Sequence, residues 1–547
     1  MPTTRADHRP RGTTHSTRHA WRHSLGLIAL AALLLAGCAT LPPGSDYPRA
    51  ASNALAHPEQ TRLGRQFAAA SAAHPGLSAF RLLPVGIDSF LLRMEMAQQA
   101  ERTLDVQYFV IENDDTGRLL QEALLQAADR GVRVRVLLDD EGSRGRTVKL
   151  TPLAAHPNIE LRVFNPAAYR GPIEFLHDVE LLSDGARMNR RMHNKLFVVD
   201  NEIGIIGGRN IGDAYFQEGR DLDFGDYDVI AAGGIVKDMS ASFDDFWNSP
   251  LAIPIEALFG GKASQKALAD YRDALAQHHV AMNDKDYMRR LAGGEPLRPL
   301  LATNAPWVWV RAEVVYDSPQ KNKVEDGDEP GRLLRHRLAK RVEETRSELL
   351  IVSPYLVPGD AGVKFLEKLR ERGLQVRILT NSLASTDMPI VHSAYQKYRI
   401  PLLESGVEIY EVRPILGQPV VSGNALKSPS AGQFALHAKV FVFDRQRVFV
   451  GSMNLDQRSL HVNTEVGVII DSPDLARQVA ARFEAIARPA NSYVLALDGT
   501  NIAGGRTLVW RTLEDGKPVE YRQEPAASIW RRAKVDMLSM LPLDELL

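Results

Sequence analysis

One pattern of eighteen residues occurs twice in this chain of 547 residues, once in each half. The first copy is HNKLFVVDNEIGIIGGRN, from His193 to Asn210, and the second is HAKVFVFDRQRVFVGSMN, from His437 to Asn454. Both copies hold histidine, lysine, aspartate, glycine and asparagine at identical offsets, with apolar residues between them. Two matches in the same register, each beginning a β-like run, predict a duplicated fold whose halves share one bipartite active site.

The His-x-Lys spacing places both side chains of each pair on one face of a strand. His193 and Lys195 lie two positions apart, as do His437 and Lys439, and an extended strand points such residues to the same side. The apolar residues that follow each lysine predict a buried strand. A lone histidine on an apolar strand is more often a satisfied core residue, but the duplication favours a functional site.

Each copy ends in a glycine-containing turn that is followed by an asparagine. Gly207 precedes Asn210 and Gly451 precedes Asn454, and glycine lets backbone amides approach an anion closely. Two lysines, two asparagines and two histidines that face one point would form a cationic pocket for a single phosphodiester. The pattern therefore predicts phosphate chemistry.

A nucleophilic imidazole must be neutral and oriented, which usually requires a carboxylate on its other nitrogen. Each half offers one after its motif, Asp228 in DYDVI and Glu465 in NTEVGVII. We predict that both orient a histidine, and the repeat leaves open whether each serves its own half or the other. Asp200 and Asp444 belong to the catalytic motifs but are expected to anchor the strand-to-turn geometry, and a plain turn-forming role explains them equally well.

Strand–helix–strand units precede both motifs. Residues 104–110 (LDVQYFV) lead through LLQEALLQAADRG to VRVRVLLD, and LLIVSPYLVPG leads through FLEKLRERG to LQVRILTN. The helical segments end at Gly131 and Gly373, which suit helix C-caps. Further strands are expected at residues 159–164 and 407–410. Alternating strands and helices predict an α/β fold, built as two pseudo-symmetric halves.

Motif content and composition divide the chain into six segments. With 44% apolar residues it can bury two substantial cores. A turn at Asp515-Gly516 predicts a hairpin near the end. The expected segments are a lipoprotein signal peptide (1–37), a tether rich in Ala and Pro (38–75), the first half (76–257), a connecting insertion (258–303), the second half (304–489) and a C-terminal extension (490–547).

The amino terminus predicts a lipid anchor. Several arginines precede an apolar run at residues 25–36, which is too short for a permanent membrane span. The run ends in Leu-Ala-Gly-Cys38, which resembles a bacterial lipobox, so Cys38 would be acylated after cleavage. It is the only cysteine, which excludes a disulfide within the chain. Ala39, in place of an aspartate, favours the periplasmic face of the outer membrane over the inner membrane of the cell envelope.

The charge balance argues against a long nucleic-acid ligand. The formal net charge is −1, and removal of residues 1–37 makes it more negative, whereas nucleic-acid-binding proteins usually carry a basic excess or stripe. A local basic patch, Arg187, Arg190 and Arg191, precedes the first motif. It suits an anionic lipid headgroup and a solvated loop equally well. We expect no nucleic-acid partner.

The duplicated motif resembles the two HKD motifs of the phospholipase D superfamily, over roughly residues 76–490. The resemblance implies two α/β/α sandwich halves and catalysis without a metal or other cofactor. It implies a covalent phosphohistidine on one histidine, by the usual assignment His193, while His437 protonates the leaving alcohol and activates the acceptor. The motif lysines and asparagines would hold the phosphoryl oxygens, together with the Ser452 hydroxyl, whereas Gly208 stands where many relatives carry serine.

Finer similarity points to the bacterial cardiolipin synthases of the C type. It lies in RMNRRMHNKLFVVDN, IIGGRNIGDAYF, SPYLVPG and TNSLASTDMPIVHSAYQKYR. It implies transfer of a phosphatidyl group from phosphatidylglycerol or phosphatidylethanolamine to a second phosphatidylglycerol, at the membrane that Cys38 would anchor the enzyme to. Acceptor contacts are expected at His392, Ser393 and Tyr395, although a surface-helix role explains these residues as well.

Three alternatives stay open. Transfer to water would make the protein a hydrolytic phospholipase D that releases phosphatidic acid. A nuclease would use the same motifs on DNA, and the acidic mature chain and lipid anchor count against it. A non-enzymatic envelope scaffold would be expected to carry degenerate motifs, yet both copies are intact. The sequence specifies no accessory protein.

Overall fold

The computed structural model describes residues 42–142, 147–170, 180, 184–216, 222–283, 285, 288, 306–321, 333–417, 433–500 and 506–540. The predicted signal peptide and Cys38 lie outside these residues. Within the described part of the chain, no helix is both long and apolar enough to span a membrane.

The first half is built on a nine-stranded sheet with the order β10-β1-β8-β6-β5-β2-β3-β4-β9. Its helices are α3 (Gly86–Gln99), α4 (Asp115–Asp129), α7 (Ile235–Trp247) and α9 (Gln265–Ala281). Its strands are β1 (Ser78–Leu83), β2 (Thr103–Tyr108), β3 (Arg133–Asp139), β4 (Ile159–Phe164), β5 (Leu196–Val199), β6 (Ile203–Gly207), β8 (Asp228–Gly233), β9 (Ala252–Pro254) and β10 (Val308–Val310).

The second half repeats this plan in a ten-stranded sheet with the order β11-β18-β17-β16-β12-β13-β14-β19-β20-β21. Its main helices are α12 (Leu334–Glu343), α13 (Gly359–Glu371), α14 (Pro389–Tyr395), α15 (Arg399–Glu404), α17 (Pro473–Ala487) and α18 (Ile529–Leu538). Its strands are β11 (Ala312–Tyr316), β12 (Glu348–Val352), β13 (Gln375–Asn381), β14 (Glu408–Val412), β16 (Val440–Phe443), β17 (Arg447–Gly451), β18 (Val466–Ile470), β19 (Ser492–Thr500), β20 (Arg506–Glu514) and β21 (Lys517–Tyr521).

The two sheets confirm the predicted duplicated α/β fold. The run β8-β6-β5-β2-β3-β4 in the first sheet matches β18-β17-β16-β12-β13-β14 in the second. Parallel pairing of β2 with β3 and of β12 with β13 follows from the strand–helix–strand units. Gly131 and Gly373 adopt φ of 91° and 86°, so both end their helices in the left-handed conformation that glycine favours.

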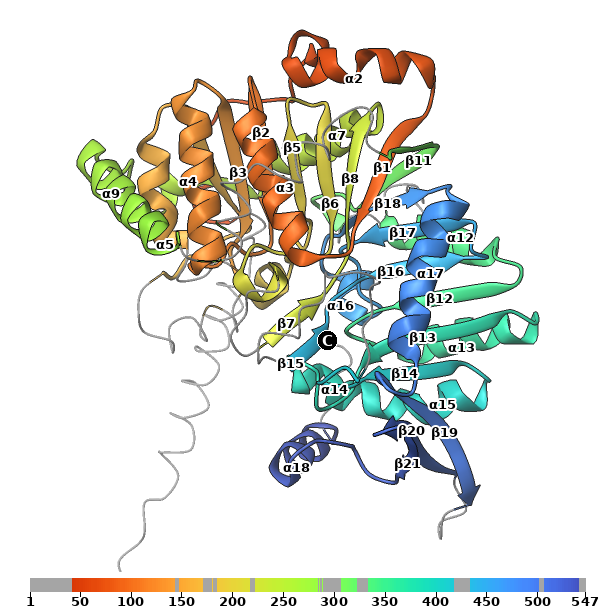
Figure 1. Ribbon diagram of the computed structural model, residues 1–547. Coiled ribbons are helices and arrows are strands. Elements are labelled where there is room, and N and C mark those ends of the chain that lie inside the picture. The colour runs from red at the N-terminus through yellow and green to blue at the C-terminus, as the bar shows by residue number, and fades with distance from the viewer. Residues whose placement is uncertain are drawn as a thin grey trace, which may run out of the picture.

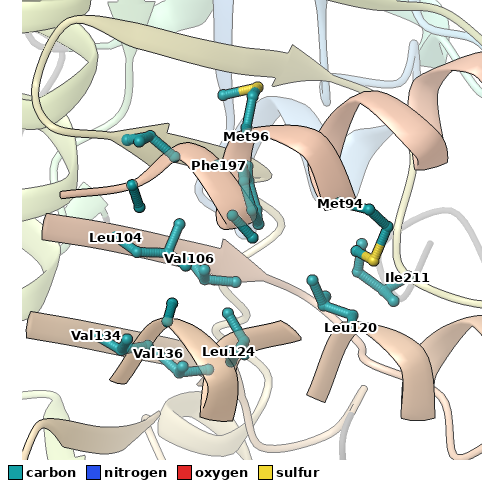
Figure 2. Close-up of a cluster of buried hydrophobic side chains, with 14 of the residues drawn as sticks. Met94, Met96, Leu104, Val106, Leu120, Leu124, Val134, Val136, Phe197 and Ile211 are labelled. Carbon is teal, nitrogen blue, oxygen red and sulfur yellow. The ribbon is translucent and has the colours of Figure 1, made fainter. Parts of the chain in front are cut away.

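The structure has three hydrophobic cores, one in each half and one that both halves share. The first packs α3 and α4 on one face of the first sheet, where Val106 and Val136 of neighbouring strands face Leu124 of α4 (Figure 2). The equivalent core of the second half lies under α12, α13 and α15. Because β-strand side chains alternate between faces, Val198 of β5 and Val440 of β16 point away from these cores into a third core that both halves share with α7 and α17. Figure 1 shows the halves side by side, with the short strands β7 (Leu222–Gly225) and β15 (Gln433–Leu436) between them.

The described part of the predicted tether is folded. Thr61 caps α2 (Arg62–Ala73) by accepting a hydrogen bond from the Gly64 amide. Leu63 and Phe67 of this helix are fully buried, and the Phe67 ring packs edge-on against Trp307 with centroids 5.5 Å apart. The tether prediction did not include this helix, which forms because an Ala-rich segment with apolar residues four positions apart is amphipathic.

Two other segments join the sheets. The predicted C-terminal extension continues the second sheet as β19, β20 and β21. Its hairpin turns at Asp515 and Gly516, with φ of 48° and 76°, as predicted. In the connecting insertion, α9 packs on α4, and Arg272 forms an ion pair with Asp129 at 2.6 Å.

Candidate active site

The motif strands β5 and β16 each begin just after the His-x-Lys pair and end at the motif aspartate. Asp200 and Asp444 occupy hairpin turns with φ of 52° and 51°, a conformation that aspartate tolerates better than most residues. Their carboxylates accept backbone N–H bonds of 2.7–3.2 Å from the residues that begin the adjacent strand, which are Glu101, Arg102 and Thr103 in the first half and Arg346, Ser347 and Glu348 in the second. Both aspartates therefore anchor the turn, as expected, at the strand end opposite the histidine, and they do not reach the site.

Each histidine pairs with a carboxylate from the opposite half. Nδ1 of His193 lies 2.9 Å from Oε2 of Glu465, and Nδ1 of His437 lies 2.6 Å from Oδ2 of Asp226. The backbone crosses between the halves in the same way, since the His193 amide donates to the Thr464 carbonyl at 2.9 Å. The two copies of the motif thus form one site. The sequence left open which histidine each carboxylate serves, and in the structure each serves the histidine of the opposite half.

Asp228 does not orient a histidine, and this part of the prediction was wrong. Its buried carboxylate accepts hydrogen bonds from Ser89 at 2.7 Å and from Arg93 at 2.9 Å, and Arg209 lies 3.3 Å away. The register explains the error. Gly207 pairs with Asp228 across β6 and β8, as Gly451 pairs with Gly467 across β17 and β18. The position equivalent to Glu465, two residues before this partner, is therefore Asp226. Counting back from the strand partner of the motif glycine would have identified it.

Ser452 supports Glu465. Its hydroxyl donates to Oε2 of Glu465 at 2.5 Å and accepts from the Val466 amide at 3.0 Å, so its hydrogen bonds are used within the protein. The single proton of the Ser452 hydroxyl is therefore directed at Glu465. Ser459 donates to the other oxygen of Glu465 at 2.8 Å, which leaves this carboxylate fully bonded.

The carboxylates are charged and the imidazoles neutral. Burial opposes the charged form of both acids. The hydrogen bond from His437 and the charges of Lys439 and Arg209 nevertheless hold the pKa of Asp226 at about 2. The hydrogen bonds from His193 and Ser452 and the charge of Lys195 hold the pKa of Glu465 below its ordinary value. Burial lowers the pKa of His437 to about 3, aided by the Lys439 charge, and lowers that of His193. A charged carboxylate only accepts, so each Nδ1 carries the proton and each Nε2 is the unprotonated nitrogen that can attack or take a proton.

The two motif lysines are buried beside the histidines. Nζ of Lys195 donates to the His193 carbonyl at 2.6 Å, and Nζ of Lys439 lies 3.1 Å from Nε2 of His437. Burial lowers the pKa of Lys195 well below its usual value and that of Lys439 to about 8, and repulsion by the Lys439 charge lowers the pKa of Lys195 further. A bound phosphodiester anion would relieve this repulsion, so the geometry favours an anionic substrate.

The motif asparagines have hydrogen-bonding capacity to spare. Asn210 donates to the Tyr215 hydroxyl at 3.0 Å. The amide oxygens of Asn210 and Asn454 are buried without a hydrogen-bond partner in the described part of the chain. Unpaired buried polar atoms are costly, and because an amide oxygen only accepts, a hydroxyl of a ligand rather than a phosphoryl oxygen could pair with them.

Aromatic rings that the sequence analysis missed surround the imidazoles. The Phe109 ring meets His193 edge-on at 5.5 Å, and the rings of Tyr215 and Phe224 lie 5.2 and 5.0 Å from His437. These residues follow strand ends or precede the partner acid, where the only sequence signal is their proximity to the motif. They restrict the imidazoles and make the site less polar.

The residues expected to contact the acceptor lie in α14. His392, Ser393 and Tyr395 are all buried there, so the surface-helix alternative does not hold. Nε2 of His392 lies 2.6 Å from the guanidinium of Arg399, which is also ion-paired at 2.6 Å with Glu524 of the C-terminal extension. The segment therefore joins the extension to the second half.

The basic patch before the first motif is mostly paired. Arg187 is buried and forms an ion pair with Asp184 at 2.5 Å, and Arg191 is buried with Glu141 2.9 Å away. The solvated-loop interpretation fails for these two residues. No group of three or more potential metal ligands occurs among the residues that the structure describes.

Comparisons with known proteins agree with this geometry. A family model described as "Cardiolipin synthase, PLD-like domain" matches residues 94–247 and 338–487. Cardiolipin synthase C of Escherichia coli K12 is 37% identical over 474 residues, which cover 87% of this chain and 97% of that protein. A cardiolipin synthase of Staphylococcus aureus strain Mu50 is 26% identical over 380 residues, 69% of this chain and 60% of that protein.

A solved structure shows the same fold. The phosphatidylserine synthase of Haemophilus influenzae Rd KW20 covers 80% of this chain and 92% of its own, with a TM-score of 0.52 and 14% identity. Two family matches, each of which contains one histidine–lysine pair, and a relative similar over nearly its whole length decide the assignment. The chain belongs to the phospholipase D superfamily and is a phosphatidyltransferase of the cardiolipin synthase-like kind.

Proposed function

We propose that this phosphatidyltransferase makes cardiolipin, taking a phosphatidyl group from phosphatidylglycerol or phosphatidylethanolamine and passing it to the hydroxyl of a second phosphatidylglycerol. The observation that carries the proposal is the pair of neutral imidazoles, each held by a carboxylate from the other half. A double displacement needs one such group as nucleophile and one as proton carrier. The similarity to cardiolipin synthase C supports the choice of acceptor.

In the proposed first step, Nε2 of His193 attacks the phosphorus of the donor lipid. The bond from phosphorus to the headgroup oxygen breaks as the proton of His437 passes to that oxygen, and a phosphatidyl-histidine remains. The ammonium groups of Lys195 and Lys439 stabilise the negative charge that grows on the phosphoryl oxygens. The anionic substrate also raises the pKa of His437, which allows it to carry the proton that it donates.

The second step reverses the first with a new alcohol. His437 removes the proton from the acceptor hydroxyl, whose oxygen attacks phosphorus and releases His193. If water takes the acceptor's place, the product is phosphatidic acid. The balance depends on how well the site excludes water, and the rings of Phe109 and Tyr215 around the imidazoles favour transfer over hydrolysis.

The test of the proposal is incubation of the protein with vesicles that contain labelled phosphatidylglycerol and phosphatidylethanolamine. Cardiolipin is the expected product. Phosphatidic acid alone would replace the transferase with a hydrolytic phospholipase D. Absence of both products, with cleavage of plasmid DNA in chelator, would overturn the lipid proposal in favour of a nuclease.

The alkaline limb of the pH profile should report Lys439. Its pKa of about 8 means that the ammonium is charged below this pH and loses its proton above it. We therefore expect kcat/KM to fall by about tenfold per pH unit above about pH 8, measured on monomeric short-chain phosphatidylglycerol. A bound anion raises the pKa, so the fall in kcat should come at higher pH. Lys439→Arg should remove this limb, and an unchanged limb in that variant would assign it to another group.

We also propose that Cys38 is acylated and holds the enzyme at the periplasmic face of the cell envelope, at the outer membrane. An anchor raises the local concentration of an enzyme whose substrate lies in a bilayer. Growth with labelled palmitate should label the wild-type protein, and Cys38→Ala should remove the label. Labelling that persists in Cys38→Ala would contradict the proposal, and membrane fractionation decides between the inner and outer membrane.

A further inference from the structure

The C-terminal helix α18 exposes an unusual number of large apolar side chains. Ile529, Trp530, Met537 and Met540, here called the α18 face, are 74%, 85%, 63% and 83% exposed. Trp530 and Met537 lie seven positions apart, which places them on one side of α18, and Met540 follows in the turn after the helix ends at Leu538. Four of the eight large exposed apolar side chains in the described residues lie in this short segment.

The opposite side of α18 is fixed to the protein. Val535 is fully buried, and the helix packs against α14 at the lower edge of the second half (Figure 1). Ser528 caps the helix by accepting a hydrogen bond from the Arg531 amide at 3.1 Å. The guanidinium of Arg531 donates to the Thr386 carbonyl at 2.5 Å. The α18 face is therefore held outward by a formed helix with a defined orientation.

The charges beside the α18 face favour an anionic lipid surface as its occupant. The helix carries Arg531, Arg532 and Lys534 against one acid, Asp536. An apolar stripe with tryptophan at one end and cations along its flank is typical of helices that lie in the membrane interface. Anionic headgroups attract such cations, whereas the core of a protein–protein interface is depleted in lysine.

The position of α18 connects this surface with the active site. Thr386, to which Arg531 binds, belongs to the loop before α14, as does Met388, which is itself 40% exposed. The same loop contains the half-buried Asp387, whose charge acts on both Arg531 and the motif lysine Lys439. The exposed apolar surface and the catalytic centre thus lie on the two sides of one loop.

We propose that the α18 face docks on the surface of an anionic phospholipid bilayer and holds the active site against the membrane that contains its substrate. The docking site adds a contact independent of acylation at Cys38. The supply of substrate by that bilayer rests on the proposed function, whereas the docking itself does not.

Quenching of Trp530 tests the docking in the full chain, whatever anchors the protein. The probe is vesicles of phosphatidylcholine and phosphatidylglycerol whose phosphatidylcholine carries bromine in its acyl chains. The difference between the wild type and Trp530→Phe isolates this tryptophan from the other five. We expect the emission maximum of Trp530 to shift to shorter wavelength on the vesicles, and the brominated lipid to quench most of its emission. If brominated lipid leaves the emission of Trp530 unchanged, the proposal is overturned. This holds also if sedimentation then shows that the α18 face is buried between two copies of the chain.

Turnover gives a second readout. Trp530→Gln/Met537→Gln should raise KM for phosphatidylglycerol in vesicles by about tenfold or more, because two large apolar contacts with lipid are lost. Turnover of monomeric short-chain phosphatidylglycerol should not change. Val280→Gln is the matched control, since Val280 is 69% exposed on α9 in the other half. Equal effects of both variants would contradict the proposal. A wild type inactive on both lipids would sink the proposed function alone, because quenching still decides the docking.

Discussion

Replacement of His193 by asparagine should abolish phosphatidyl transfer, with a loss of at least about 10⁴-fold, because the variant lacks the oriented imidazole nitrogen that acts as nucleophile in the proposed first step. His437→Asn should lose turnover to a similar extent but for another reason. It retains the nucleophile and lacks the group that activates the acceptor. We therefore expect His437→Asn to accumulate a phosphatidyl-enzyme.

Brief incubation with phosphorus-labelled phosphatidylglycerol measures this intermediate. Label that is stable in alkali and labile in acid, on His437→Asn but not on His193→Asn, is the expected result and the signature of a phosphohistidine. The opposite pattern would exchange the roles of the two histidines. Label on neither, in variants that keep the wild-type circular dichroism and melting temperature, would contradict the covalent mechanism.

The two acids at the start of β8 should separate activity from stability. Asp226→Asn removes the charged partner of His437 and should lower kcat by about 10²- to 10⁴-fold in a folded protein. Asp228→Asn should instead lower the free energy of unfolding by about 3–5 kcal/mol, because Arg93 and Arg209 keep buried charges that have lost their counter-ion.

Denaturant unfolding and turnover, measured on the same samples, check this pair. Glu465→Gln serves as the counterpart of Asp226→Asn in the other half, with the same expected loss. Full activity in a well-folded Glu465→Gln protein would show that this carboxylate is only structural. A stable and active Asp228→Asn would show that the Arg93 contact contributes little.

The duplicated motif predicted most of the fold because periodicity and repeats report local structure directly. The strands around His193 and His437 and the helices that end at Gly131 and Gly373 follow from spacing and glycine conformation. Asp226 was missed because which of two nearby acids reaches a histidine depends on strand register between distant segments, which no local pattern contains.

The same limit explains the other errors. The Ser452 hydroxyl looked available for phosphate, but Glu465 lies thirteen positions later in the chain and takes its hydrogen bond. His392 looked like an exposed polar residue, yet Glu524 and Arg399 pair with it in the interior. Folding brings the partners of such side chains together from distant parts of the sequence. A local sequence pattern therefore predicts a strand better than it predicts these contacts.

The exchange of acids between the halves makes catalysis a property of their docking. A half separated from the other would hold an imidazole with no fixed tautomer and a carboxylate with no base to orient. We therefore expect a chain whose halves have not docked to be inert towards lipid. Mild denaturation that loosens the core around Val198 and Val440 should silence the enzyme before either sheet unfolds.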